Sequence, residues 1–172
     1  MPTDYTPATP MDVKSFIRSK IYLVRPEGYM TVLLVNEGLN VDNPREAYTE
    51  VRERNQHLSV PILVKTGDSN MTGSCTAKVS EYYSTSGGYS LYEFLTKTGR
   101  ASGLTGVLTS EKDTITIKQV TWTADKTETQ ILTPCVVTNV NFNPNGDNGV
   151  ATLSFQYECF ANEPTIVAGD VP

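Results

Sequence analysis

Residues 151–159 read ATLSFQYEC, and this stretch decides the fold class. Apolar side chains stand at every second position, which is the period of a β-strand with one buried face. The core-facing side chains are then Ala151, Leu153, Phe155, Tyr157 and Cys159. The side chains facing away are Thr152, Ser154, Gln156 and Glu158.

The rest of the chain repeats this kind of pattern. Residues 130–142 precede the stretch across the turn sequence NPNGDNG at 143–149, which predicts a long closing hairpin. Other alternating or β-branched runs predict further strands at 20–25, 30–36, 57–65, 72–82, 102–109 and 114–123. Pro26, Glu27 and Gly28 supply the turn of a first hairpin. Near Lys118 and Gln119 the apolar residues change from one set of alternate positions to the other, which predicts a bulge in that strand.

One short helix interrupts the strands. Ser90 and Glu93 have the spacing of a capping box, in which each side chain bonds the backbone N–H of the other residue. Leu91, Phe94 and Leu95 form an apolar stripe behind it. Gly99 suits the left-handed residue that closes a helix.

These elements predict a mainly β fold: an antiparallel β-sandwich or partly closed barrel with one short flanking α-helix. Residues 20–160 form the single domain, between an N-terminal arm at 1–19 and a C-terminal tail at 161–172. Residues 37–56 are rich in charge and turn formers, which predicts a long loop inside the domain.

Composition limits the function. The chain has 172 residues, of which 38% are hydrophobic and 19% charged, with a formal net charge of −5. This length fits one domain with its own core, and the charge content is too low for a disordered chain. No apolar run is long enough to cross a bilayer, and no patch of Lys and Arg gathers to neutralise phosphates. Residues 1–10 lack the regions of a signal peptide, so we expect a protein made in a cytoplasm.

The sequence offers no set of catalytic groups. His57 is the only histidine and is expected at the surface, while the three cysteines Cys75, Cys135 and Cys159 are expected as small buried groups. The acids Glu81, Glu111, Asp113, Asp125 and Glu158 are expected to be ordinary solvated side chains. Asp68, Asn70, Asp147 and Asn148 lack the spacing of a calcium loop. We predict no enzyme, no cofactor and no metal site.

The order of motifs carries a resemblance. Residues 73–79, the helix at 89–98, residues 103–108, residues 114–120 and the closing hairpin together resemble the phage tail tube (major tail) proteins, over about residues 57–160. The resemblance implies a structural virion protein that forms hexameric rings. The rings stack into a hollow tail tube through which DNA passes during ejection.

The resemblance also implies partners and a location. The partners are other copies of the chain and further tail proteins such as sheath, terminator or baseplate subunits, with transient passage of DNA and no membrane. The location is the tail of a virion assembled in the host cytoplasm.

Two sets of residues are candidates for this function. The candidate lumen residues, acidic or small and polar so that DNA slides past, are Thr76, Ser80, Glu81, Thr152, Ser154, Gln156 and Glu158. Lys78 and Lys118 also stand at the polar positions of their strands. If they faced the channel, their positive charge would weaken the idea of a lumen along which DNA slides. The candidate inter-subunit residues in the 37–56 loop are Arg45, Glu46, Glu50, Arg52, Glu53 and Arg54.

Two other functions remain open. A tail terminator or a baseplate tube-like subunit would form rings without long tubes. A β-sandwich module that binds a carbohydrate or protein is the second alternative, since Tyr82, Tyr83, Tyr89 and Tyr92 gather around the helix and could stack on a sugar.

Overall fold

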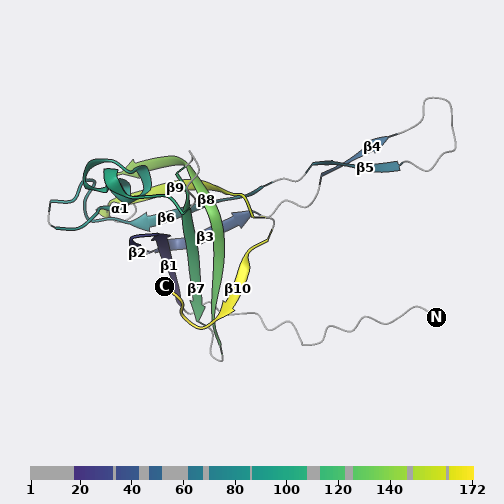
Figure 1. The fold of residues 1–172 in the computed structure, drawn as a ribbon. Coiled ribbons are helices and arrows are strands. Elements are labelled where there is room, and N and C mark those ends of the chain that lie inside the picture. Colours follow the sequence, from purple (N-terminus) through teal and green to yellow (C-terminus); the bar gives the residue numbers. More distant parts are fainter. Residues whose placement is uncertain are drawn as a thin grey trace.

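The protein is described from a computed structural model, in which two sheets and one short helix are seen (Figure 1). The structure describes residues 18–32, 34–42, 47–51, 62–67, 70–85, 87–107, 113–122, 126–146, 149–161 and 163–172.

Eight strands form one antiparallel sheet. They are β1 (Arg18–Arg25), β2 (Gly28–Val32), β3 (Leu34–Asp42), β6 (Met71–Lys78), β7 (Ile115–Trp122), β8 (Thr127–Asn143), β9 (Thr152–Cys159) and β10 (Thr165–Ala168). Their order is β2-β1-β7-β8-β9-β6-β3, and β10 pairs with β8. The predicted mainly β, antiparallel class with one short helix is confirmed.

The other elements are few. β4 (Ala47–Val51) and β5 (Ile62–Gly67) pair with each other in a second sheet, which projects away from the large one (Figure 1). The helix α1 spans Leu91–Thr96, and a 3-10 helix, η1, follows at Gly99–Gly103. No helix among the described residues is long and apolar enough to cross a membrane.

The large sheet curls almost into a barrel. β2 and β3 stand at opposite ends of the strand order, yet only residue 33 separates them in the chain. The end of β2 therefore lies beside the start of β3, and the described residues of these two strands do not pair with each other. The result is an open, strongly curved sheet with the core inside the curve.

Strand β8 holds the curved sheet together. Its first half, up to Cys135, pairs with β7, and residues 128–131 pair with β10 on the opposite edge. Its second half pairs with β9 from Cys135 to Asn143. One strand of 17 residues thus runs through both sides of the curved sheet.

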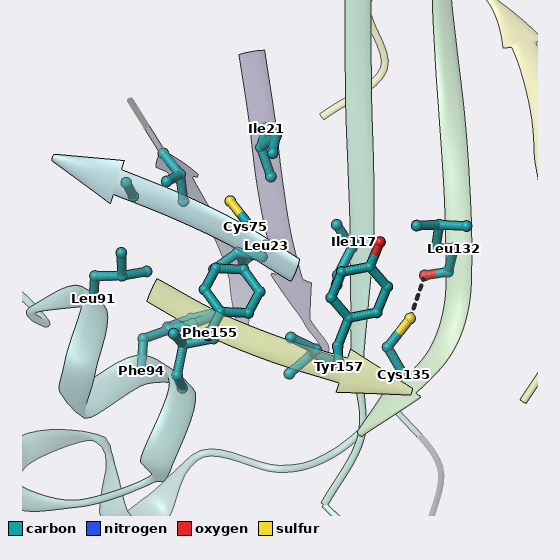
Figure 2. Packing of buried hydrophobic residues seen from close by; sticks show 14 of the residues in the cluster. Ile21, Leu23, Cys75, Leu91, Phe94, Ile117, Leu132, Cys135, Phe155 and Tyr157 are labelled. Carbon is teal, nitrogen blue, oxygen red and sulfur yellow. Dashed lines mark hydrogen bonds between the residues drawn. The ribbon is translucent and has the colours of Figure 1, made fainter. Parts of the chain in front are cut away.

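The core contains four of the five side chains predicted to face it from residues 151–159. Leu153, Phe155, Tyr157 and Cys159 are buried, whereas Ala151 precedes β9 and is only partly buried. Figure 2 shows Phe155 beside α1 and Tyr157 facing Ile117 and Leu132. Gly73 lies opposite Tyr157 on β6, and the Tyr157 hydroxyl donates to the backbone oxygen of Asn40 at 3.0 Å. A single side chain thus links β9 across β6 to β3.

The helix begins as predicted and ends at Thr96, three residues before Gly99. Ser90 and Glu93 form both bonds of the capping box. The first left-handed residue after the helix is Lys97, with φ of 54°, and Gly99 repeats this conformation with φ of 57°. Gly99 is needed for a second reason, since an added Cβ would meet the Glu93 carboxylate.

Several expected elements differ in the structure. Residues 37–42 and 47–51 of the predicted 37–56 loop are strand, because backbone pairing with β6 and β5 outweighs their polar composition. The predicted 161–172 tail contains β10. In the predicted strand at 102–109, the described residues 102–107 belong to η1 or follow it outside any strand, and Val107 donates its N–H to the oxygen of Thr114 at 2.9 Å. The predicted run at 30–36 divides into β2 and β3, and the bulge lies between Ile115 and Ile117 instead of near Lys118.

Candidate assembly surface

The outward side of β6, β9 and the second half of β8 is lined by small polar side chains. Adjacent strands set these side chains in rows, such as Ser74 beside Gln156 and Thr76 beside Ser154. We call this surface the polar face. It consists of Thr72, Ser74, Thr76, Lys78, Asn139, Asn141, Asn143, Thr152, Ser154, Gln156 and Glu158.

Five of the seven candidate lumen residues lie on the polar face. Thr76 and Ser154 share a hydrogen bond of 2.9 Å, and Glu158 accepts one of 2.7 Å from Asn70. Gln156 is exposed between them, whereas Thr152 is buried beside the turn at Gly146. The sequence pattern therefore found an outward surface on which two hydroxyl groups bond each other across β6 and β9, while the Glu158 carboxylate bonds an amide that precedes β6.

The other two candidates lie beyond the strand. Ser80 and Glu81 follow the end of β6 at Lys78, because the predicted strand at 72–82 is shorter than its pattern. Ser80 is exposed, and the Glu81 carboxylate accepts two hydrogen bonds of 3.2 Å from Thr85. Glu81 thus closes a local turn.

Sequence reasoning missed the contribution of β8. Asn139, Asn141 and Asn143 are exposed opposite Gln156, Ser154 and Thr152, while Val140 and Phe142 pack on the core. The signal was available, because asparagine stands at every second position of this stretch. It adds three neutral side chains to the polar face.

Of the two lysines singled out, only Lys78 lies on this surface. It is exposed in the row of Thr152. Lys118 stands on β7 opposite Tyr22 of β1, and its ammonium donates to the backbone oxygen of Pro172 at 2.8 Å. Lys118 is therefore engaged in docking the C-terminus.

Two strand edges flank the polar face. β3 ends the strand order on one side. On the other side, β7 pairs with β8 only as far as Cys135. Among the residues that the structure describes, no strand pairs with that edge of β8 beyond Cys135. Unpaired edges are templates for pairing with another chain.

A groove runs along the open edge of β8. It has a volume of about 620 Å³ and is bordered by Val136–Val140 on one side and by Tyr92, Leu95 and Thr96 of α1 on the other. Phe160 also lines it and is 40% exposed. The groove leaves space beside the edge where α1 does not cover it.

A buried ion pair holds α1 beside this groove. The Arg25 side chain is fully buried and bonds Asp113 at 2.6 and 3.1 Å. It also donates to the backbone oxygen of Phe94 at 2.9 Å, near the end of α1. Asp113 was expected to be a solvated acid, but it neutralises a buried charge that joins β1, α1 and the start of β7.

The buried Glu93 fixes the other end of α1. Its carboxylate accepts backbone N–H bonds from Ser90, Ser84 and Arg100 at 3.0, 3.1 and 3.3 Å. The bond from Ser90 is the main reason that the pKa of Glu93 lies below its usual value. Glu93 thus organises the loops on both sides of the helix, which its capping-box role alone did not predict.

The tyrosines around α1 pack mainly on one another. Tyr82 stacks on Tyr92 with ring centres 4.1 Å apart, and its edge contacts Tyr83 and Phe142. Tyr82 therefore joins α1 to β8. Tyr83 and Tyr89 are about half exposed, but the stacked faces of Tyr82 and Tyr92 are occupied by each other.

The remaining candidates have mixed outcomes. All three cysteines are buried and free, as predicted. No group of three or more His, Cys, Asp or Glu residues suited to a metal occurs in the described part of the chain. Glu50 lies in β4, opposite Leu63 of β5. The other residues predicted in this region lie outside the described residues: His57, Arg45, Glu46, Arg52, Glu53 and Arg54.

Comparison with known proteins finds matches only among solved structures. No model of a protein family matches the chain, and no curated protein matches it. A chain in the cryo-EM structure of the anti-feeding prophage baseplate has a TM-score of 0.58 at 9% identity, with 93% of this chain and 97% of that chain covered.

Two further matches come from an extracellular contractile injection system in its extended state. A chain of the sheath-tube complex has a TM-score of 0.54 at 10% identity, covering 94% of both chains. A chain of the sheath/tube terminator has a TM-score of 0.52 at 13% identity, covering 93% of this chain and 98% of that one. The chain therefore shares a fold with components of phage-like injection particles.

Proposed function

We propose that this chain is a non-catalytic structural subunit that forms hexameric rings, stacked into the tube of a phage tail or a related particle. The observation that carries the proposal is the polar four-stranded unit β3-β6-β9-β8, whose two outer edges pair with no strand among the described residues. The shared fold with contractile injection system components supports the same class.

Ring closure would use the two edges. The edge of β3 in one copy pairs with the β8 edge beyond Cys135 in the next, within the groove beside α1. This contact joins different surfaces of the two copies, so repeating it by rotation closes a ring. Six copies of a domain of this size would form a ring about 100 Å wide.

In such a ring the polar faces would line the channel. Neutral hydroxyl and amide groups give phosphate no strong partner, so DNA would slide past them. Glu158 adds repulsion, and Lys78 is the one cation within the described rows of the polar face. Because this surface carries little positive charge, it suits a channel that DNA passes through better than a site that binds DNA.

Stacking between rings would use the projecting parts of the chain. The β4–β5 hairpin extends beyond the large sheet (Figure 1), and the charged candidates Arg45, Glu46, Glu50, Arg52, Glu53 and Arg54 belong to this region. The 1–19 arm is the second candidate. The C-terminal residues are weaker candidates, because β10 is already paired.

A single backbone group offers a test of the edge. Phe160 donates its N–H to Pro134, and bonded pairs alternate along antiparallel strands, so the N–H of Val137 points away from β9. Val137→Pro removes this donor from the open edge, whereas Val137→Thr keeps it with a similar shape. We expect rings by negative-stain microscopy and native mass spectrometry for the wild type and Val137→Thr, but monomers for Val137→Pro.

Circular dichroism and thermal unfolding of the Val137→Pro monomer provide the control for folding. A folded Val137→Pro protein that still forms rings would show that this edge is not the contact. A wild-type protein that stays monomeric at high concentration would overturn the ring proposal itself.

A terminator or baseplate ring component is the second candidate, favoured by the fold matches to a baseplate chain and a terminator chain. Purified rings that stay single at high concentration would support it over a tube subunit. A carbohydrate-binding module has less support, since the Tyr82 and Tyr92 faces cover each other.

A further inference from the structure

Two of the three free cysteines face each other across neighbouring strands. Cys135 of β8 is the register partner of Cys159 of β9, and both side chains are fully buried. Cys75 is elsewhere in the core, opposite Phe155, and Figure 2 shows it well apart from Cys135. Cys159 stands four positions after Phe155 on β9, a distance of roughly 13 Å along the strand.

The backbone brings the facing pair close enough for a covalent bond. Phe160 donates its N–H to the oxygen of Pro134, so the next pair along the strands, Cys135 and Cys159, is a non-hydrogen-bonded pair. The Cα atoms of such pairs are about 4.5 Å apart. Disulfides span Cα distances of about 4.4–6.8 Å, so the strands already have a suitable separation.

The surroundings make the two thiols unequal. The hydrogen bond from Cys135 lowers the pKa of Cys159, and the backbone N–H groups of Ala161 and Thr133 act in the same direction. The same sulfur contact raises the pKa of Cys135, whose thiol also lies 3.4 Å from the oxygen of Leu132. Cys159 ends β9 next to the exposed Phe160, so an oxidant reaches it first, and we assign Cys159 as the attacking thiolate and Cys135 as the resolving thiol.

We propose that Cys135 and Cys159 form a redox site that closes into a cross-strand disulfide on reaction with a low-molecular-weight disulfide. The Cys159 thiolate attacks one sulfur of the oxidant, which forms a mixed disulfide and releases one thiol. Cys135 then loses its proton and attacks the Cys159 sulfur, which releases the second thiol. The two protein thiols are oxidised, and their protons and two electrons end on the two small thiols.

Access to the site is through the end of β9. Cys159 is the last residue of that strand, and the next residue, Phe160, is 40% exposed. Local opening of a strand end requires less free energy than global unfolding, so it can admit a small oxidant. The bond would join β8 to β9 at Cys135, where β8 passes from its doubly paired half to its open half.

The test uses the full-length chain in redox buffers of oxidised and reduced glutathione. After equilibration, the protein is unfolded, its thiols are alkylated, and its peptides are mapped by mass spectrometry. We expect a Cys135–Cys159 link with Cys75 alkylated. The oxidised protein should melt roughly 5–10 °C above the reduced one.

Matched variants separate the pair from the third cysteine. Cys75→Ser should still form the link, whereas Cys159→Ser should leave no intramolecular disulfide. If Cys159→Ser does not fold, Cys135→Ala removes the other cysteine of the pair. The peptide map of the wild-type protein tests the link without any variant.

Three results would overturn the proposal. One is a link that includes Cys75. Another is a lasting glutathione adduct on a single cysteine with no cross-strand bond. The third is three alkylated cysteines after equilibration, including a cycle through mild denaturant that lets the strands open and close. The test does not depend on ring formation, so it stands whether or not the proposed function is correct.

Discussion

The two halves of β8 differ in what completes them. The first half has β7 on one edge and β10 on the other, and the buried Thr129 hydroxyl donates to Gly169 at 2.6 Å and accepts from Val171 at 3.2 Å. The second half has β9 on one edge and a groove on the other, with Asn139 and Asn141 exposed. The same strand is closed by its own chain at one end and left open at the other.

This difference suggests separate roles for the two halves of β8: the first stabilises the fold, and the second is available for the proposed assembly. The C-terminal strand β10 blocks the edge that could otherwise pair without specificity, which is a common way to protect a sheet. In the described part of the chain, no strand covers that edge of the second half. Since an exposed edge invites association, its retention beside a neutral polar face is the feature that most favours a ring.

The largest expected effect comes from opening the closed half. Deletion of residues 163–172 removes four register pairs with β8 and both partners of Thr129. We expect a loss of about 5 kcal/mol in the free energy of unfolding and irregular aggregation, because a second edge becomes available. Denaturant unfolding and size-exclusion chromatography measure the two effects.

The matched control for this deletion is Ile166→Thr. It changes a side chain that is 67% exposed and leaves the backbone pairing in place. Unchanged stability of the deletion protein would contradict the protective role of β10.

A smaller effect is expected from the ion pair beside the open half. Asp113→Asn leaves the buried Arg25 charge without its carboxylate, which we expect to cost about 3 kcal/mol. Lys97→Gln is the control, since Lys97 is partly exposed and 3.7 Å from the same carboxylate, and its loss should cost under about 1 kcal/mol. Equal effects of the two variants in urea unfolding would refute this assignment.

The smallest effect is expected at Gly73, beneath Tyr157. An added Cβ would lie 2.5 Å from Cζ of the Tyr157 ring and would also meet the Asn40 carbonyl, so β3 must shift. We expect Gly73→Ala to cost about 1–3 kcal/mol and to weaken ring formation through the β3 edge. Gly103→Ala meets no atom within 4 Å and should change neither property. Thermal unfolding and native mass spectrometry provide the comparison.

The sequence predicted the elements whose pattern is local. The alternation at 151–159 and the capping box at Ser90 each depend on side chains within one segment. The capping box was confirmed, and the alternation was confirmed from Leu153 to Cys159, whereas Thr152 is buried instead of exposed. β10 was missed because all four of its side chains are exposed. Its position is set by backbone bonds to β8, about 35 residues earlier in the chain, for which residue identity gives no signal.

The candidate site was predicted in part for the same reason. Alternation identified Thr76, Ser154, Gln156 and Glu158 as an outward face, but it could not show that β8 and β9 place Asn141 beside Ser154. Asp113 was misjudged because its partner Arg25 lies 88 residues earlier. The lumen and inter-subunit assignments are predictions about the assembled particle.

The single residue between β2 and β3 has a mechanical consequence. These strands end the sheet on opposite sides, and the covalent chain connects them directly. A neighbour that pulled sideways on β3 would load its hydrogen bonds to β6, and at Leu34 it would also load the backbone that leads into β2. At that point the two ends of the sheet could not separate without stretching a covalent link.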